Sequence, residues 1–216
     1  MPIFTPPSRD CPLCPRLVAF LEESRRVRPD WHNAPVPAFG QLDASLLIVG
    51  LAPGLNGANR TGRPFTGDYA GELLYETLAH YGLAQGIYDR RADDGFTLVN
   101  CRVTNSVRCV PPANKPLPLE IKNCRNFLIS EIAAMPNLKG ILMLGRIAHE
   151  SLLRTLDLKL SQFPFIHGKL HKAVGPNGPL ILADSYHCSR YNTNTGRLTP
   201  AMFRKVVGEL IVQIKV

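Results

Sequence analysis

The stretch Ser45-Leu-Leu-Ile-Val-Gly50-Leu-Ala-Pro-Gly54 joins a short apolar run to a loop that opens on glycine. The run is rich in Leu, Ile and Val and is bounded by a polar residue and by glycine, which is typical of a buried strand in a parallel sheet. The glycines that follow permit tight turns and a close approach of the backbone to a ligand. The stretch therefore predicts a parallel sheet with a binding loop at the end of one strand.

Three further apolar runs and four helical patterns follow along the chain. Strands are expected at residues 45–51, 96–103, 140–144 and 179–183, and helices at 71–81, 119–135, 147–158 and 200–216. Strands that alternate with helices predict an α/β fold, a three-layer sandwich with a central, mainly parallel four-stranded sheet flanked by helices. No internal repeat or linker interrupts the pattern, so we expect a single domain over residues 1–216.

The residues that follow the predicted strands locate the site. In open α/β sheets a ligand binds beyond the carboxyl ends of the strands. The four strand-end segments are residues 50–69, residues 105–115, Gly145 and residues 185–197. We expect these segments to converge on one site.

Composition narrows the class of protein. The chain has 216 residues, of which 45% are hydrophobic and 19% charged, as in a globular protein. No apolar run approaches about 18 residues, and the N-terminus lacks the basic-then-apolar order of an export signal, so we expect a cytoplasmic protein without membrane contact. The net charge of +8 favours nucleic acid as a partner only modestly, since many small proteins are basic without binding it.

Four of the six cysteines suggest a metal centre. Cys11 and Cys14 form a C-x2-C pair, and Cys109 and Cys124 could supply two further thiolates. Four thiolates suit either a structural zinc ion or a [4Fe–4S] cluster. A redox-active Cys pair is the alternative, but no βαβ pattern surrounds Cys11 as such a motif requires. The remaining Cys101 lies in an apolar run and is expected in the core.

The glycine loop matches neither common phosphate-binding signature, because G-x-x-x-x-G-K-[ST] and a strand-to-helix G-x-G-x-x-G are both absent from it. Residues Gly50–Gly71 instead resemble motif A of the uracil-DNA glycosylase superfamily. Residues Asn105–Lys115 resemble the uracil-reading segment of its iron–sulfur families, and Tyr186–Asn192 is similar to the histidine-bearing motif B. The cysteine spacing is similar to that of the [4Fe–4S] ligands in families 4 and 5, and the resemblance covers nearly the whole chain.

Family 5 is the better match within this superfamily. Family 4 carries a glutamate where this chain has Ala52, whereas family 5 has an apolar motif A and an Asn-Arg-Thr-Gly-Arg extension, here Asn59–Arg63. Motif B departs from the frequent His-Pro-Ser and reads His187-Cys188-Ser189. The resemblance implies a monofunctional DNA glycosylase of base excision repair, acting as a nucleoid-associated monomer. It also implies excision of uracil and of other deaminated bases such as hypoxanthine, and a [4Fe–4S] cluster that clamps the N-terminal segment.

The chemistry of base excision assigns a role to each candidate residue. Phe65 would stack on uracil, Asn105 would read its edge, and His187 would donate a hydrogen bond to O2. The wall of the pocket would come from the motif A residues Gly50, Ala52 and Gly54. Simpler alternatives are a core Phe, an Asn that caps a turn and a structural His.

Asp68 is the second candidate catalytic residue besides His187. Because position 52 is alanine, no carboxylate is available there to stabilise a cationic sugar or to position water, and Asp68 lies close by in the same loop. The alternative is a helix N-cap, since Asp is favoured there and a helix is expected to follow. Both interpretations remain open from the sequence.

DNA contacts are expected from two groups of residues. Ser189, Arg190 and Tyr191 would fill the gap left by the flipped base. Phosphate contacts, or alternatively solvated surface charges, are expected from the basic residues Arg60, Arg63, Lys115 and Arg197.

Two other functions compete with the glycosylase. A non-catalytic iron–sulfur protein that binds nucleic acid would share the basic surface and the cluster, yet it has no use for Phe65, Asn105 and His187 in one pocket. A zinc-stabilised nucleotide hydrolase is disfavoured because the sequence lacks a phosphate loop and a set of catalytic metal ligands.

Overall fold

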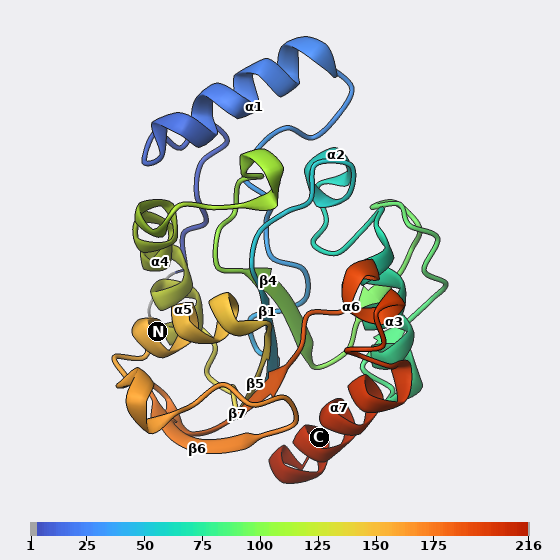
Figure 1. Cartoon of the computed structure of the whole chain (residues 1–216), viewed down its shortest axis with the longest axis vertical. Helices are drawn as coiled ribbons and strands as arrows, with labels where there is room; N and C mark the ends of the chain where they lie inside the picture. The colour runs from blue at the N-terminus through green and yellow to red at the C-terminus, as the bar shows by residue number, and fades with distance from the viewer. Residues whose placement is uncertain (1–3, 216) are drawn as a thin grey trace.

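A five-stranded sheet lies between two layers of helices in the computed structural model, which describes residues 4–215 (Figure 1). The strand order is β4-β1-β5-β7-β6, and all neighbours pair in parallel except β6, which is antiparallel to β7. The bounds of the strands are Leu46–Gly50 for β1, Cys101–Asn105 for β4, Gly140–Leu144 for β5, Leu170–Gly175 for β6 and Gly178–Ser185 for β7.

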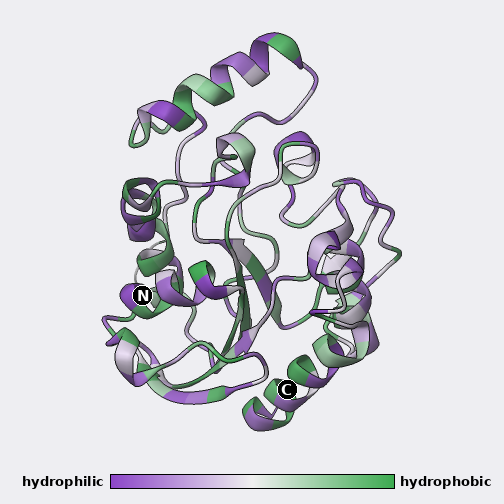
Figure 2. Cartoon of the chain, viewed as in Figure 1, coloured by the Kyte–Doolittle hydropathy of each residue, from purple (hydrophilic) through white to green (hydrophobic). Residues whose placement is uncertain are grey.

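Each face of the sheet is covered by two helices. On β1 the side chains of Leu46 and Ile48 belong to one core cluster, together with residues of α3 (Tyr69–His80) and α7 (Pro200–Ile214). Leu47 and Val49 belong to the other, together with residues of α4 (Pro118–Ala133) and α5 (Arg146–Thr155). Both faces of β1 are therefore buried, and the hydrophobic strands occupy the middle of the molecule (Figure 2). The α/β sandwich predicted from the sequence is confirmed.

The remaining elements are short or lie outside the two helix layers. The longest of them is α1 (Pro15–Val27), which lies at one end of the molecule (Figure 1). The others are α2 (Ala58–Thr61), β2 (Ala84–Gln85), β3 (Thr97–Leu98), η1 (Pro112–Asn114), η2 (Leu160–Gln162) and α6 (Arg190–Asn194).

The number of strands in the predicted sheet was wrong. The fifth strand, β6, is a half-exposed edge strand with an outward-facing Lys172, so it lacks the continuous apolar run that marks the central strands. The strand predicted at 96–103 is two strands, because the backbone turns through Asn100, whose φ is 50°. β3 pairs with β2 in a small separate sheet, and only β4 joins the main one. Helix α1 was not predicted at all.

The parallel register aligns the strand ends that carry the candidate residues. In the β1–β4 pair Gly50 lies opposite Asn105, and in the β5–β7 pair Leu144 lies opposite Ser185. The segments that follow these strands consequently leave the sheet at the same edge, as the position of the motifs predicted.

A buried ionic cluster ties α4 to β4. Glu131 of α4 accepts hydrogen bonds from Arg102 Nε at 2.7 Å, from Thr104 Oγ1 at 3.1 Å and from the guanidinium of Arg108. The Glu131 side chain is fully buried, and burial alone would raise its pKa, but the two guanidinium groups lower it. The cluster therefore fixes the segment on either side of Asn105.

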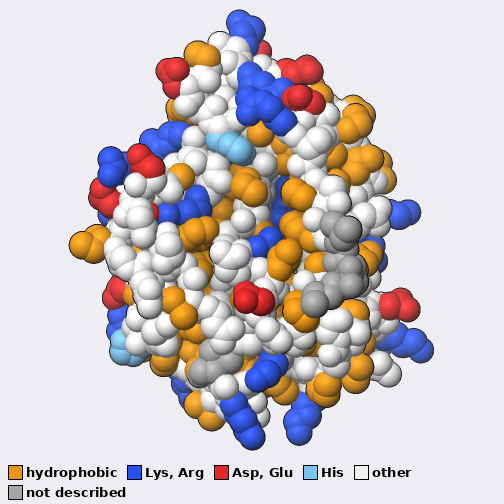
Figure 3. Space-filling view, turned by 180° about the vertical axis from the view of Figure 1, so that it is seen from behind, with side chains coloured by type: hydrophobic (Ala, Val, Ile, Leu, Met, Phe, Trp, Pro, Cys, Tyr) orange, Lys and Arg blue, Asp and Glu red, His pale blue; other side chains and the backbone are white. Residues whose placement is uncertain are grey.

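Charged residues elsewhere are distributed over the surface. On the face opposite to that of Figure 1, Lys and Arg side chains are spread among uncharged and hydrophobic ones rather than gathered in one block (Figure 3). Among the described helices, none combines the length and the apolar character that crossing a membrane requires.

Replacing Glu131 with glutamine should destabilise the protein strongly. Glu131→Gln keeps the shape of the side chain but leaves two buried guanidinium groups without a counter-charge, which costs about 3–5 kcal/mol of unfolding free energy. Urea unfolding of the variant measures this loss. The matched control is Glu23→Gln, which breaks an exposed pair with Arg26 and should leave the midpoint unchanged. Equal midpoints for the two variants would contradict a stabilising role of the cluster.

Candidate active site

A cavity of about 560 Å³ opens at the edge of the sheet where the parallel strands end. Its wall joins the loop after β1, the end of β4, the start of α3 and the segment after β7. The lining residues are Leu51, Ala52, Pro53, Gly54, Ala58, Phe65, Gly67, Asp68, Tyr69, Ala70, Asn105, Asn114, His187, Ser189 and Arg190. The structure thus brings Phe65, Asp68, Asn105 and His187 together, although they lie up to 122 positions apart in the sequence.

Gly50 shapes the cavity from behind its wall. A Cβ atom at this position would lie 2.4 Å from Asn105 Oδ1 and 2.6 Å from Phe65 Cζ, which are impossible contacts. Ala52 and Gly54 do line the cavity, as expected of motif A. The role of Gly50 is therefore to leave room for the side chains of Asn105 and Phe65.

Phe65 is part of both the core and the cavity wall. Its side chain is only 6% exposed and packs in the core cluster on the α3 and α7 side of the sheet. Its ring stacks on the ring of His187, with centroids 5.8 Å apart and planes 25° apart. Core packing fixes the ring while one surface lines the cavity, so a planar ligand can lie against it.

Asn105 carries a buried acceptor that needs a donor. The residue is 4% exposed, and its Oδ1 has no hydrogen-bond partner among residues 4–215. An unpaired buried polar atom is unfavourable by about 1–3 kcal/mol. Because Asn105 lines the cavity, a ligand with an N–H group at this point would relieve that cost.

His187 is a half-buried imidazole held by the segment after β7. Asn192 Nδ2 donates to the backbone carbonyl of His187 at 2.8 Å, which fixes the main chain next to the ring. Burial lowers the pKa of His187 to about 4, because the charged imidazolium is poorly solvated there. At neutral pH the ring is therefore uncharged and can donate one hydrogen bond into the cavity.

Asp68 is a helix N-cap, as one of the two interpretations of the sequence predicted, and it also lies at the cavity. It is the N-cap of α3, where Oδ1 accepts a hydrogen bond from Gly71 N at 3.3 Å. It also lines the cavity, and its Oδ2 lies against the loop, 3.2 Å from where a Cβ of Gly54 would be. Burial raises the pKa of Asp68, and hydrogen bonds from the amides of Gly71 and Ala70 offset only part of that rise.

Most of the residues expected to contact DNA lie at the surface. Ser189 caps α6 and lines the cavity beside Arg190, whose guanidinium lies 5.5 Å from the ring centroid of Tyr69. Tyr191 is 72% exposed next to them. The other exposed basic residues of this group are Arg60, Lys115 and Arg197.

The expected phosphate contact of Arg63 is wrong. Its side chain is 5% exposed, and both terminal nitrogens donate to the carboxylate of Asp94 at 2.7 Å. A guanidinium that is buried and fully paired cannot reach a phosphate without breaking that pair. No local pattern indicates this pairing, because Asp94 lies 31 positions away in the chain.

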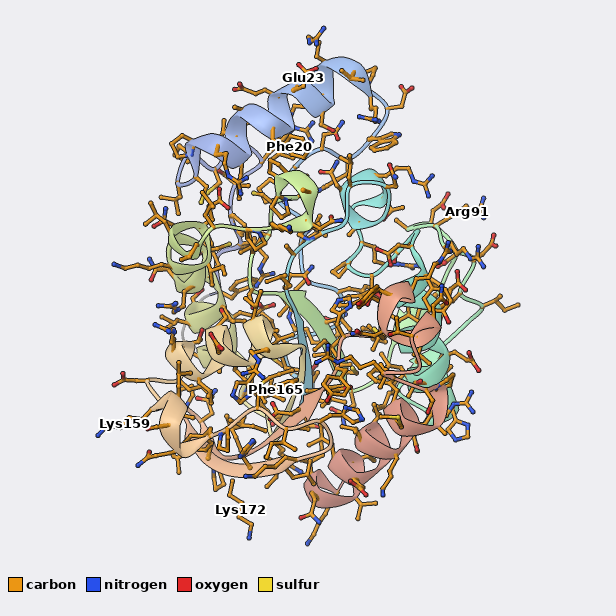
Figure 4. All side chains as sticks on the ribbon, in the orientation of Figure 1. Phe20, Glu23, Arg91, Lys159, Phe165 and Lys172 are labelled. Carbon is orange, nitrogen blue, oxygen red and sulfur yellow. The ribbon has the colours of Figure 1, made fainter. Side chains whose placement is uncertain are left out.

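Sequence reasoning also missed residues at the site. Tyr69 and Asn114 line the main cavity. A second cavity of about 320 Å³ shares Leu51 and His187 with the first and contains Arg146 beside Arg197. Its aromatic wall includes Phe165, which Figure 4 labels close to α5. The only signal for Arg146 was its position directly after Gly145, at the end of a predicted strand.

The four cysteines predicted to bind metal line one small cavity between α1 and α4. Cys11 and Cys14 come from the turn before α1, and Cys109 and Cys124 come from the segment after β4 and from α4. Asn123 Nδ2 donates to the carbonyl of Leu13 at 2.7 Å, which docks the turn on α4. Within residues 4–215 no three His, Cys, Asp or Glu side chains converge closely enough to hold a single metal ion. The structure thus brings the four cysteines to one small cavity without the close convergence that a single metal ion requires.

The His187 ring should remain uncharged throughout the neutral range. Because burial places its pKa at about 4, its NMR chemical shifts should stay constant from pH 8 to pH 5 and move only as the pH approaches 4. The spectrum of His187→Ala identifies the resonances by their absence. A titration centred near the ordinary value of 6.5 would contradict the burial argument.

Comparison with known proteins supplies independent information. Residues 37–211 match the Uracil DNA glycosylase superfamily. The chain is 45% identical to the type-5 uracil-DNA glycosylase of Thermus thermophilus, over 92% of this chain and 91% of the relative. It is 36% identical to the type-5 uracil-DNA glycosylase of Pyrobaculum aerophilum, over 92% and 86% of the two chains.

Type-4 proteins are more distant. The type-4 uracil-DNA glycosylase of Archaeoglobus fulgidus is 34% identical over 63% of this chain and 61% of the relative. The likeness to type-5 proteins extends over nearly the whole chain, in agreement with the apolar Ala52 of motif A. The chain therefore belongs to the uracil-DNA glycosylase superfamily, within its type-5 group, and this confirms the resemblance inferred from the sequence motifs.

Proposed function

We propose that this protein is a DNA glycosylase that flips uracil out of DNA and hydrolyses its N-glycosidic bond. The observation that carries the proposal is the cavity in which Phe65, Asn105, His187 and Asp68 meet. An aromatic face, an unpaired amide oxygen, a neutral imidazole and a carboxylate are what recognition and departure of a pyrimidine require. A protein that only binds nucleic acid would have no need for this set in one pocket.

Recognition of the flipped base would depend on Phe65 and Asn105. Extrusion costs unstacking energy, and stacking on an aromatic ring recovers about 1–3 kcal/mol per base. The N3–H group of uracil would donate to the buried Oδ1 of Asn105, and Nδ2 of Asn105 would donate to O4. Cytosine offers an acceptor at N3 and a donor at its amino group, so it would face like groups at both positions.

Departure of the base would depend on His187 and Asp68. As the bond between C1′ and N1 breaks, uracil gains negative charge, and a hydrogen bond from neutral His187 to O2 would stabilise it by about 3 kcal/mol. The deoxyribose gains positive charge, which the carboxylate of Asp68 would stabilise while it positions the attacking water. Ala52 provides no carboxylate for this task.

The DNA around the flipped nucleotide would contact the rim of the cavity. Ser189, Arg190 and Tyr191 lie where a side chain could enter the gap left by the base. The exposed Arg60, Lys115 and Arg197 would contact phosphates, which makes binding weaken as salt concentration rises.

We further propose a [4Fe–4S] cluster at the four cysteines, in preference to zinc. The four cysteines line one cavity, and no three of the described ligand side chains converge as tetrahedral zinc needs, with four sulfurs at about 2.3 Å from one point. The cysteine spacing also resembles that of [4Fe–4S] ligands, which are four thiolates. Cys11, Cys14, Cys109 and Cys124 would hold the cluster, which would clamp the N-terminal segment to α4 and to the segment that follows Asn105.

The proposal extends to a place in base excision repair. Among the described residues that line the cavity none is a lysine, so a monofunctional reaction that leaves an abasic site is proposed. Hypoxanthine is proposed as a further substrate because the type-5 resemblance implies it. The protein would act as a monomer on nucleoid DNA.

Asp68→Asn should separate catalysis from helix capping. Asparagine caps helices as well as aspartate does, so the thermal midpoint and the affinity for DNA should stay close to those of the natural protein. The single-turnover rate of uracil excision should fall by about 10²–10⁴-fold. Excision is measured on duplex oligonucleotides by alkaline cleavage at the abasic site, with hypoxanthine or thymine in place of uracil for comparison.

The pH dependence of this rate carries a second signature of Asp68. Since only the carboxylate can stabilise a cation, the rate should fall as pH drops through the pKa of Asp68. Burial raises that pKa, so the fall should begin above the ordinary value of 3.8, and Asp68→Asn should abolish it. A near-normal rate for Asp68→Asn would remove Asp68 from the reaction.

The cluster can be tested by metal content. Protein purified without oxygen should contain about four iron atoms per chain and absorb visible light, and Cys109→Ser or Cys124→Ser should lose both properties. The matched control is Cys101→Ala, a buried cysteine of β4 outside the set, which should keep its iron. A colourless protein that contains one zinc ion would contradict the cluster.

A further inference from the structure

The segment Arg63-Pro64-Phe65-Thr66 holds the stacking residue in an unusual backbone conformation. Phe65 has a φ of 52°, in the left-handed region that large L-residues rarely adopt. Such a conformation persists only where the surroundings over-determine it. The side chain of the neighbouring Arg63 and the aromatic residues around it supply contacts that hold this segment.

The guanidinium of Arg63 closes the segment on itself and ties it to a distant loop. Nε donates to Thr66 Oγ1 at 2.8 Å, so the side chain bridges the two residues that flank Pro64 and Phe65. Nη1 and Nη2 donate to the two carboxylate oxygens of Asp94, each at 2.7 Å. Both side chains are nearly inaccessible, at 5% and 1% exposure. Three directed bonds thus hold one planar group.

An aromatic box encloses this ion pair. The Cζ atom of Arg63 lies 5.1 to 5.8 Å from the centroids of four rings, which belong to Phe39, Tyr75, Tyr88 and Phe96. Tyr88 and Phe96 come from the loop that carries Asp94, whereas Phe39 and Tyr75 come from two other segments. Together the rings shield from solvent a cation whose charge Asp94 balances. The ion pair is thereby fixed in position.

The same aromatic residues hold the backbone on both sides of the Cα of Phe65. The hydroxyl of Tyr75 donates to the carbonyl of Pro64, and the hydroxyl of Tyr88 donates to the carbonyl of Phe65 at 3.1 Å. The Thr61 hydroxyl lies 3.2 Å from the carbonyl of Thr66 as a further donor. The two peptide planes that set φ and ψ of Phe65 are therefore each held by a side chain from outside the segment.

Asp94 is itself fixed by its own loop. Its carboxylate accepts hydrogen bonds from the amides of Asp89 at 2.9 Å and Phe96 at 3.0 Å. Arg91, in the same loop, projects from the outer edge of the molecule in Figure 4, and Asp93 is 82% exposed, whereas Asp94 turns inward. The loop thus presents one buried carboxylate to Arg63 and leaves its other charges in solvent.

We propose that Arg63 and Asp94 are positioning residues that hold the ring of Phe65 in place against the base. This inference rests on the proposed uracil excision, in which Phe65 stacks on the flipped base. Arg63 touches neither the base nor the DNA; it acts through the conformation of Phe65. Loss of the ion pair frees the backbone at Phe65, and the ring then loses its fixed place beside His187.

A double-mutant cycle tests this role. Asp94→Asn and Arg63→Lys are each made in the natural protein and in Phe65→Ala, and the affinity for free uracil and the single-turnover excision rate are measured. With Phe65 present, each substitution should weaken uracil binding by roughly tenfold, since a base–aromatic stack accounts for about that much affinity or more. In Phe65→Ala the same substitutions should change binding less than about twofold, because no ring remains to be positioned.

The matched control is Asp93→Asn, which removes the neighbouring exposed carboxylate and should leave both quantities unchanged. A purely stabilising ion pair would lower the unfolding midpoint without changing the affinity of the folded protein. Equal losses in the Phe65 and Phe65→Ala backgrounds, or full affinity in Asp94→Asn, would overturn the proposal. Absence of uracil excision by the natural protein would instead overturn the proposed function itself.

Tyr88→Phe keeps the test available if the ion-pair variants do not fold. It removes only the hydroxyl that donates to the carbonyl of Phe65 and leaves the ring of the box. Its affinity for uracil should fall in the presence of Phe65 and stay constant in Phe65→Ala. Unchanged affinity in both backgrounds would contradict the proposal that the ion pair and the aromatic box position Phe65.

Discussion

The parallel pairing of β1 with β4 is the constraint on which the site depends. It places Gly50 opposite Asn105, so the motif A loop and the segment that begins at Asn105 leave the sheet side by side. Glycine is required at that point, because any Cβ would collide with both Asn105 and Phe65. The register of the sheet and the absence of a side chain at Gly50 therefore allow the ring of Phe65 and the amide of Asn105 to line one cavity.

Buried ion pairs fix the segment around Asn105 and the segment that carries Phe65. Glu131 holds Arg102 and Arg108 on either side of Asn105, and Asp94 holds Arg63 beside Phe65. In each case a carboxylate from a distant segment balances the charge of buried guanidinium groups. Such pairs add little stability relative to apolar packing, but breaking one is costly, so they specify geometry. Arg190, in contrast, has its charged group at the surface beside the cavity.

Desolvation shifts the pKa values of the two candidate catalytic groups in opposite directions. Burial disfavours the charged form of each, so it keeps His187 neutral and raises the pKa of Asp68. A neutral imidazole can donate to a leaving anion without binding it permanently. A carboxylate that is poorly solvated gains more from a nearby cation than one in water, because little solvent has to be displaced.

The sequence by itself determined the class of fold, the chemical identity of the pocket and the family. Central strands such as Leu46–Gly50 are apolar on both faces, so their signal is local, and glycine motifs, cysteine spacing and the His187 segment can be recognised as strings of letters. Local patterns failed where the chain is half-exposed or depends on distant partners, as at strand β6, at Asn100 and in helix α1.

Only the tertiary structure decided what individual polar residues do. Arg60 and Arg63 lie three positions apart in one motif, yet Arg60 is exposed and Arg63 is enclosed by four rings and Asp94. Asp68 caps a helix and faces the cavity at once, a combination that depends on where α3 begins relative to the loop after β1. The reason is physical: the state of a charged side chain depends on its solvation and its partners, and those are set by contacts between segments far apart in sequence.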